Sequence, residues 1–462
     1  MTLKKKILYF YIFTFWFLLW AAINTLPEEI NGFGVSFIKS INALRILLPV
    51  IISILSFFFL IKINFLYLKN IRNYKFHKII QNCNFLFLIY FFIQVLGIYK
   101  NNFSIYNFDS LFLIYLGTGT ISIFLLINYY NLEKVFKYLM FFTIFIIILV
   151  TIYISVISFK KTELKDLTYI YGLIRADTLF LNQEMPRITG LSRLWAVISL
   201  FALIIFYNTN NNYIKYFIFV FIILLTTIIW AAQSRGTLIC YFLLIIFITV
   251  FNIKKVIKKI LFIINFIFVP IIIYTLIIST LSLSDNNSIN SNNLSNLSNL
   301  NNSSNVNIYK DVIYKSRVID NKTSSGRLEI WSDILNKFDK TRFFGYGPQA
   351  DRNLVGRELT KKFSNNASNL YVYAFACGGY IAVIIFLIIN IQIIKNLYQV
   401  VFEKKLFLSK NNFEIKYSAA ILLFFLTRGL IENSYSLFSI DFLLVIISMS
   451  IIKNYLKKTY KN

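Results

Sequence analysis

The sequence predicts an all-α membrane protein with about twelve transmembrane helices. Of its 462 residues, 58% are hydrophobic and 18% are aromatic. The charged residues gather in short clusters that separate long apolar runs. A run of about 18 apolar residues is long enough to cross a bilayer as a helix. Lipid offers no partners to backbone N–H and C=O groups, so a spanning segment must be a helix or part of a closed barrel.

Twelve apolar runs are candidates for these helices, and the sixth, eighth, eleventh and twelfth are short. They cover residues 7–24, 45–61, 79–98, 110–128, 138–158, 194–208, 213–230, 237–252, 260–281, 369–394, 417–430 and 438–452. The first run follows a basic tail, lacks a small-residue cleavage site and is followed by further apolar runs. We therefore expect it to remain as a helix rather than to be removed as a signal peptide.

The distribution of lysine and arginine predicts that both termini are cytoplasmic. Short cytoplasmic loops carry an excess of these residues. If the lysines at positions 4–6 lie inside, the segments on that side hold roughly half of the 47 basic residues but only three acids, Glu133, Glu403 and Glu414. The net charge of +27 therefore reflects topology and does not indicate nucleic-acid binding.

The same topology divides the chain into three parts. Residues 1–281 contain the first nine helices, residues 282–368 form a large outward loop, and residues 369–462 contain the last three helices and a basic cytoplasmic tail. Within the loop, the Asn/Ser-rich tract 285–308 is too polar to offset the entropy of ordering it, which predicts disorder. Residues 325–340 place apolar residues at helical spacing after Ser325, which predicts a capped amphipathic helix.

Arginine is concentrated on the predicted outer side. Arg235 lies in QSRG, where the chain turns directly from the seventh run into the eighth, and Arg327 falls in the first turn of the amphipathic helix. Further charged residues at this side are Arg187, Arg193, Arg428 and Glu432. A guanidinium is a planar fork that binds phosphate oxygens in pairs and keeps its charge in partly dry surroundings. The arginines therefore suggest a phosphate group at the outer leaflet. For each arginine taken alone, the alternative is interfacial contact with lipid phosphates.

Several classes of site are excluded by composition. The single histidine, His77, falls in a predicted cytoplasmic loop, which excludes a Ser/His triad on the outer face. The three cysteines are scattered and offer neither a disulfide framework nor metal-ligand spacing. The glycine motifs of phosphate loops and dinucleotide sites are absent as well. We therefore expect no cofactor and no metal.

A set of short motifs follows in a characteristic order. SRG at a span boundary precedes a long outer loop with GRLEIW and GYG, and SNLYVYAFACGGYIA opens the next span. Over residues 187–434 this order resembles the O-antigen ligase and O-antigen polymerase superfamily of bacterial membrane glycosyltransferases. In the ligases the loop ends with a histidine, then Asn, Ser or Gln, nine residues, Gly, two residues and a small residue. Here Ser368 takes the place of the histidine, and Asn369, Gly379 and Ala382 keep the register.

The resemblance implies a metal-independent transfer of a glycan from undecaprenyl pyrophosphate at the periplasmic face of the bacterial inner membrane. Membrane lipids and a chain-length regulator are the further partners it implies. By this resemblance Arg235 and Arg327 hold the pyrophosphate, whose developing charge they stabilise. Glu432 could act as the base or orient the acceptor, or form a structural ion pair with Arg428. The expected catalytic residues are Arg235, Arg327, Ser368 and Glu432, and the expected substrate-binding residues are Arg187, Arg193, Asn369, Tyr373 and Arg428.

Three functions remain open. Serine at position 368 cannot replace histidine as a base, which favours a polymerase that extends a lipid-linked repeat unit over a ligase that modifies the lipid A core. A flippase for lipid-linked sugars would also suit twelve spans. The concentration of polar residues on one side argues against transport, because transport requires groups reachable from both sides.

Overall fold

The computed structural model describes most of the predicted helices and part of the outer loop. The described residues are 3–21, 50, 51, 53–55, 58, 83–100, 108–130, 135–145, 189–231, 234–253, 255–292, 327–338, 343–355, 367–403, 406–408 and 412–459. Arg187, Ser325 and residues 293–308 lie outside them, as does the side chain of Arg235. Within these ranges the chain is helical and contains no strand. The expected all-α class is therefore confirmed for this part of the chain.

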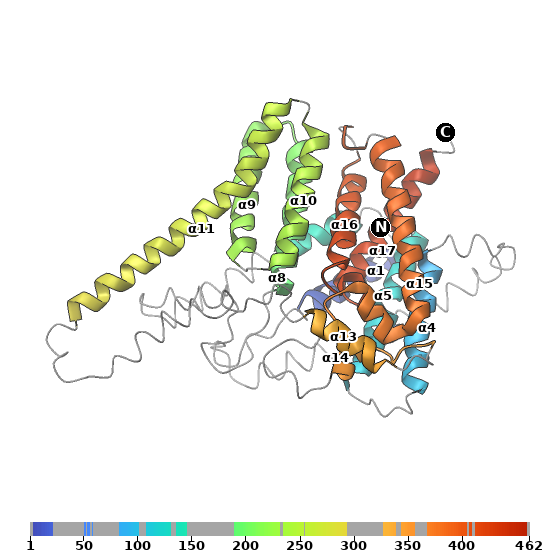
Figure 1. The fold of residues 1–462 in the computed structure, drawn as a ribbon. Coiled ribbons are helices and arrows are strands. Elements are labelled where there is room, and N and C mark those ends of the chain that lie inside the picture. The colour runs from blue at the N-terminus through green and yellow to red at the C-terminus, as the bar shows by residue number, and fades with distance from the viewer. Residues whose placement is uncertain are drawn as a thin grey trace, which may run out of the picture. The chain divides into compact units, whose positions relative to one another are not determined.

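The helices separate into two compact units, which are described one at a time (Figure 1). The first unit contains α1 (Leu3–Ala21), α4 (Cys83–Lys100), α5 (Phe108–Tyr130), α13 (Arg327–Lys337), α14 (Ala350–Val355), α15 (Leu370–Tyr398), α16 (Phe413–Gly429) and α17 (Ile440–Thr459). In it α15 packs against α4 and α14, and α17 packs against α16 and α5. These units cut across the three parts expected from hydropathy, because contacts join helices from both ends of the chain.

The second unit contains α8 (Thr189–Asn208), α9 (Asn212–Ala231), α10 (Arg235–Asn252) and α11 (Val256–Asn292). Helix α9 packs against α8 and α11, and α10 packs against α8 and α11. The buried hydroxyl of Tyr241 hydrogen-bonds both Ser199 of α8 and Thr226 of α9, the latter at 2.9 Å. Such hydrogen bonds join apolar helices where the hydrophobic effect between them is weak.

Three described helical stretches are long and apolar enough to cross a membrane: Asn212–Trp230, Val256–Leu276 and Leu370–Glu403. Shorter apolar helices occupy Phe85–Tyr99, Leu113–Leu125, Val135–Phe145, Ser192–Asn208 and Gly236–Asn252. Many of their large apolar side chains are exposed, including Phe92, Phe217 and Ile264. These features define a multi-pass membrane protein, and the number of twelve spans stays a prediction.

Helix α11 corrects one expectation for the outer loop. It continues to Asn292, so residues 285–292 of the Asn/Ser tract are helical rather than disordered. A tract of low helix propensity can be helical here because extension of an existing helix requires no new nucleus.

Helix α15 corrects another expectation, because the run 369–394 is not one continuous helix. Gly379 has φ 66° and ψ −160°, which breaks the helix into a half-helix, residues 370–378, and a long helix that follows. The hydroxyl of Tyr371 accepts a hydrogen bond from Nδ2 of Asn390 at 2.6 Å. In a straight helix, residues 19 positions apart would be separated by about 28 Å along the axis. The half-helix therefore folds back along the long helix.

The end of the half-helix is closed by the GYG segment of the outer loop. The backbone N–H of Tyr346 donates to the carbonyl of Ala376 at 2.9 Å, and that of Gly347 donates to Cys377 at 3.0 Å. These bonds satisfy carbonyl groups that a helix end leaves without partners. A Cβ atom on Gly345 would lie 2.3 Å from the Cys377 carbonyl carbon, so only glycine allows this approach.

Candidate functional site

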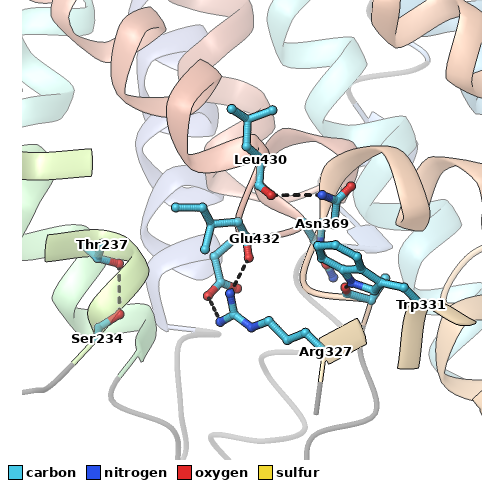
Figure 2. A network of polar contacts seen from close by, with 10 residues as sticks. Ser234, Thr237, Arg327, Trp331, Asn369, Leu430 and Glu432 are labelled. Atoms are coloured by element: carbon cyan, nitrogen blue, oxygen red, sulfur yellow. Dashed lines mark hydrogen bonds and ion pairs between the residues drawn. The ribbon is translucent and has the colours of Figure 1, made fainter. Parts of the chain in front are cut away.

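The polar junction at the start of α13 joins the outer loop to the connection between α16 and α17. Arg327 is the first residue of α13. It therefore lies in the first turn of this helix, as expected from the sequence. Its Nη2 lies 3.2 Å from Oε1 of Glu432, and its Nη1 donates to the carbonyl of Ile431 at 2.9 Å. The two side chains are 31% and 23% exposed, so both remain accessible to a ligand. Figure 2 shows the guanidinium of Arg327 directed at Glu432.

Asn369 fixes the start of the half-helix beside this pair. Its Oδ1 accepts from the backbone N–H groups of Tyr371 and Val372 at 2.9 and 3.1 Å, which makes it the N-cap of α15. Its Nδ2 donates to the carbonyl of Leu430 at 2.9 Å (Figure 2), and its backbone N–H donates to Oδ1 of Asn433. Both ends of its side-chain amide are thus engaged within the protein, so its observed role is to hold two segments together.

Ser368 precedes this cap in a constrained turn. It has φ 43°, a left-handed conformation that is uncommon for residues other than glycine, and it is buried. The neighbouring Ala367 donates its backbone N–H to Oδ2 of Asp351 at 2.8 Å, and its carbonyl accepts from Nε1 of Trp331. Helices α13 and α14 therefore determine the conformation of the turn. The residue at the position of the ligase histidine is a buried serine.

Arg428 does not form the ion pair with Glu432 that the sequence suggested. Its Nη1 lies 3.0 Å from Oδ2 of Asp441 on α17, and the two side chains are 7% and 1% exposed. The mistake has a simple cause. Glu432 is four residues from Arg428, and their backbones hydrogen-bond, but the carboxylate turns to Arg327. Arg428 is therefore occupied in a buried pair and is poorly placed to bind substrate.

We expect Arg428→Met to destabilise the protein by about 3–5 kcal/mol, because it leaves the Asp441 carboxylate buried without its countercharge. The double variant Arg428→Met/Asp441→Leu should recover much of this loss, since neither charge then remains. Thermal unfolding of the purified protein measures both effects. A single variant as stable as the wild type would show that the pair contributes little.

Among the remaining predicted residues, the structure describes Tyr373, Arg193 and the backbone of Arg235. Tyr373 was expected to line the site, but it is buried in a cluster with Ile334, Ala376 and Cys377, and its hydroxyl accepts from the backbone N–H of Gln349 at 3.4 Å. Arg193 is partly buried on α8 in the second unit. Arg235 is the first residue of α10, directly after Ser234.

Several residues that hold the junction and the helices next to it were not predicted, and for two of them the sequence offered an indication. Asp441 and Asn390 are polar residues inside apolar runs, and buried polar groups need partners. The carbonyls of Leu430 and Ile431 carry no such signal, because any residue type supplies a backbone carbonyl. Among the described residues, no group of three or more His, Cys, Asp and Glu could hold a metal ion.

The described part of the chain is that of a helical, multi-pass membrane protein in which an arginine–glutamate pair joins the start of α13 to the connection between α16 and α17. Residues 217–387 match the family described as O-antigen ligase. This part of the chain is therefore similar to the O-antigen ligase family, whose members are glycosyltransferase-like enzymes that act on lipid-linked oligosaccharides. The matched residues run from α9 into α15 and include Arg235, Arg327, Ser368 and Asn369. No curated protein and no solved structure matches the chain.

Proposed function

We propose that the protein is a surface-polysaccharide polymerase. It transfers a glycan from undecaprenyl pyrophosphate to a lipid-linked repeat unit at the periplasmic face of the bacterial inner membrane. The observation that carries the proposal is the Arg327–Glu432 pair, which lies beside a buried serine where the ligases have a histidine. The match of residues 217–387 to the O-antigen ligase family supports the class of donor.

Arg327 supplies the charge that this reaction requires. The leaving group is a lipid diphosphate, and its negative charge grows as the bond to the sugar breaks. A guanidinium placed before the reaction stabilises that charge without reorganising, which lowers the barrier. Arg327 is held at its Nη atoms by Ile431 and Glu432 and remains partly exposed, so its remaining N–H groups can meet phosphate oxygens. We assign the same role, stabilising the charge of the diphosphate, to a second arginine, Arg235.

Glu432 is the group that can take a proton. In the proposed step, the acceptor hydroxyl oxygen forms a bond to the anomeric carbon of the donor sugar. The bond from that carbon to the phosphate oxygen breaks, its electron pair leaves with the diphosphate, and the hydroxyl proton passes to the Glu432 carboxylate. Before this step, the diphosphate of the bound donor competes with Glu432 for Arg327, which frees the carboxylate for the acceptor.

The serine at position 368 favours a polymerase over a ligase. A serine hydroxyl is too weak a base to replace an imidazole. Its burial and its fixed backbone further separate it from an incoming acceptor. A test of the function must therefore distinguish an extended lipid-linked glycan, the product of a polymerase, from a glycan attached to the lipid A core, the product of a ligase.

Deletion of the gene, followed by electrophoresis of surface glycans, distinguishes the candidate functions. Loss of the long ladder, with a single repeat still attached to its acceptor, is the expected result for a polymerase. A bare lipid A core with accumulated lipid-linked polymer would instead identify a ligase. Accumulation of single units that face the cytoplasm would identify a flippase. Complementation with the intact gene restores the ladder and excludes an effect on neighbouring genes.

A further inference from the structure

Asn390 is a buried polar residue in the middle of an apolar helix. It belongs to the long part of α15, within the run AVIIFLIINIQII, and it is 7% exposed. A buried amide must find hydrogen-bond partners, because leaving it without them costs free energy. Its two partners come from two different segments of the Arg327 junction.

One partner holds the start of the half-helix. Nδ2 of Asn390 donates to the hydroxyl of Tyr371 at 2.6 Å, and Tyr371 lies two residues after the cap residue Asn369. The backbone N–H of Tyr371 also donates to Oδ1 of Asn369. Asn390 therefore fixes the same helical turn that carries Asn369 and, before it, Ser368.

The other partner holds the turn that carries Glu432. Oδ1 of Asn390 accepts a hydrogen bond from the hydroxyl of Tyr435, which is fully buried and lies three residues after Glu432. Burial raises the pKa of Tyr435 well above its ordinary value, so the hydroxyl stays protonated and donates. The next residue of this turn, Ser436, is held through its carbonyl by the hydroxyl of Tyr90 at 2.8 Å.

We propose that Asn390 is a positioning residue that fixes the spacing between the Asn369 cap and the Glu432 turn, and thereby places Glu432 for its role in glycan transfer. This inference rests on the proposed function. One amide spans both segments because it donates at one end and accepts at the other. Aspartate could only accept in its ionised form, and leucine of similar volume could do neither.

The test uses full-length protein in nanodiscs and the lipid-linked repeat unit extracted from cells that lack the gene. We expect Asn390→Leu to lower kcat about 30-fold while the KM for the lipid-linked repeat changes less than about twofold, because a displacement of about 1 Å at a reacting group can cost up to about 100-fold. Tyr435→Phe removes one of the two bonds and should lower kcat about fivefold. Hydrogen exchange should rise in peptides covering residues 369–372 and 430–436.

Asn396→Leu, on the same helix and partly exposed, is the matched control and should keep both kinetic constants and both exchange patterns. Rates are compared per amount of folded protein. The inference is overturned if Asn390→Leu behaves like Asn396→Leu, or if its KM rises while kcat stays unchanged. Should Asn390→Leu fold poorly, Tyr371→Phe and Tyr435→Phe keep the test decisive, since each removes a single hydroxyl. Wild-type protein that transfers no glycan would instead overturn the proposed function itself.

Discussion

Replacing Arg327 with lysine is expected to lower glycan transfer by about 100-fold although the positive charge is kept. The guanidinium contacts the carbonyl of Ile431 and the carboxylate of Glu432 through two different nitrogens, and it has further N–H groups for a diphosphate. A lysine ammonium is a single point and cannot make these contacts together. Removal of one donor that stabilises a developing charge typically costs about 100- to 1000-fold in rate. Transfer measured with the extracted lipid-linked repeat checks this value.

Further variants sharpen the result. Arg235→Lys should cause a comparable loss if both arginines bind the diphosphate, and Lys337→Arg at the other end of α13 should cause none. Glu432→Gln should also lower transfer strongly, and combining it with Arg327→Lys should cost less than the product of the separate losses, because residues that act as a unit are not additive. Near-normal transfer by both arginine variants would mean that the diphosphate binds elsewhere.

The second large effect is expected at the break in α15. Gly379→Ala should destabilise the protein by about 3 kcal/mol or more. The new Cβ atom would lie 2.2 Å from the carbonyl oxygen of Phe343, a backbone atom that cannot rotate away, and φ at this position is 66°. This combination of φ 66° and ψ −160° is essentially restricted to glycine, and it alone costs a residue with a side chain about 1–3 kcal/mol. Thermal unfolding of the purified protein, with its yield from membranes, measures the loss.

Gly429→Ala is the matched comparison, because its added Cβ would meet the side chain of Leu370 at 3.1 Å, and a side chain can shift. We expect it to cost less than half as much. Equal stability of the Gly379 variant and the wild type would show that the half-helix does not need the backbone conformation described above.

The helical architecture could be predicted well because it follows from composition and from the length of apolar runs. Helix α13 was expected at residues 325–340 and occupies Arg327–Lys337. The break in α15 could not be found by these means, since residues 370–378 and the helix after them form one uninterrupted apolar run. It depends on backbone hydrogen bonds from residues 346 and 347, which are remote in sequence.

The candidate site was predictable where a motif fixed the register. Arg327, Ser368, Asn369 and Glu432 were singled out from the sequence, and the structure brings them to one junction. The ion-pair partner of Glu432 was not predictable. Both Arg327 and Arg428 were candidates, and the sequence does not show toward which of them the carboxylate is directed.

The folded-back half-helix also sets a distance. Asn390 follows Gly379 by eleven residues, which corresponds to about 16 Å along a helix axis. Its bond to Tyr371 brings the beginning of the half-helix to that point of the long helix. A change at residue 390 therefore reaches a turn 19 residues earlier in the chain without passing through the break at Gly379.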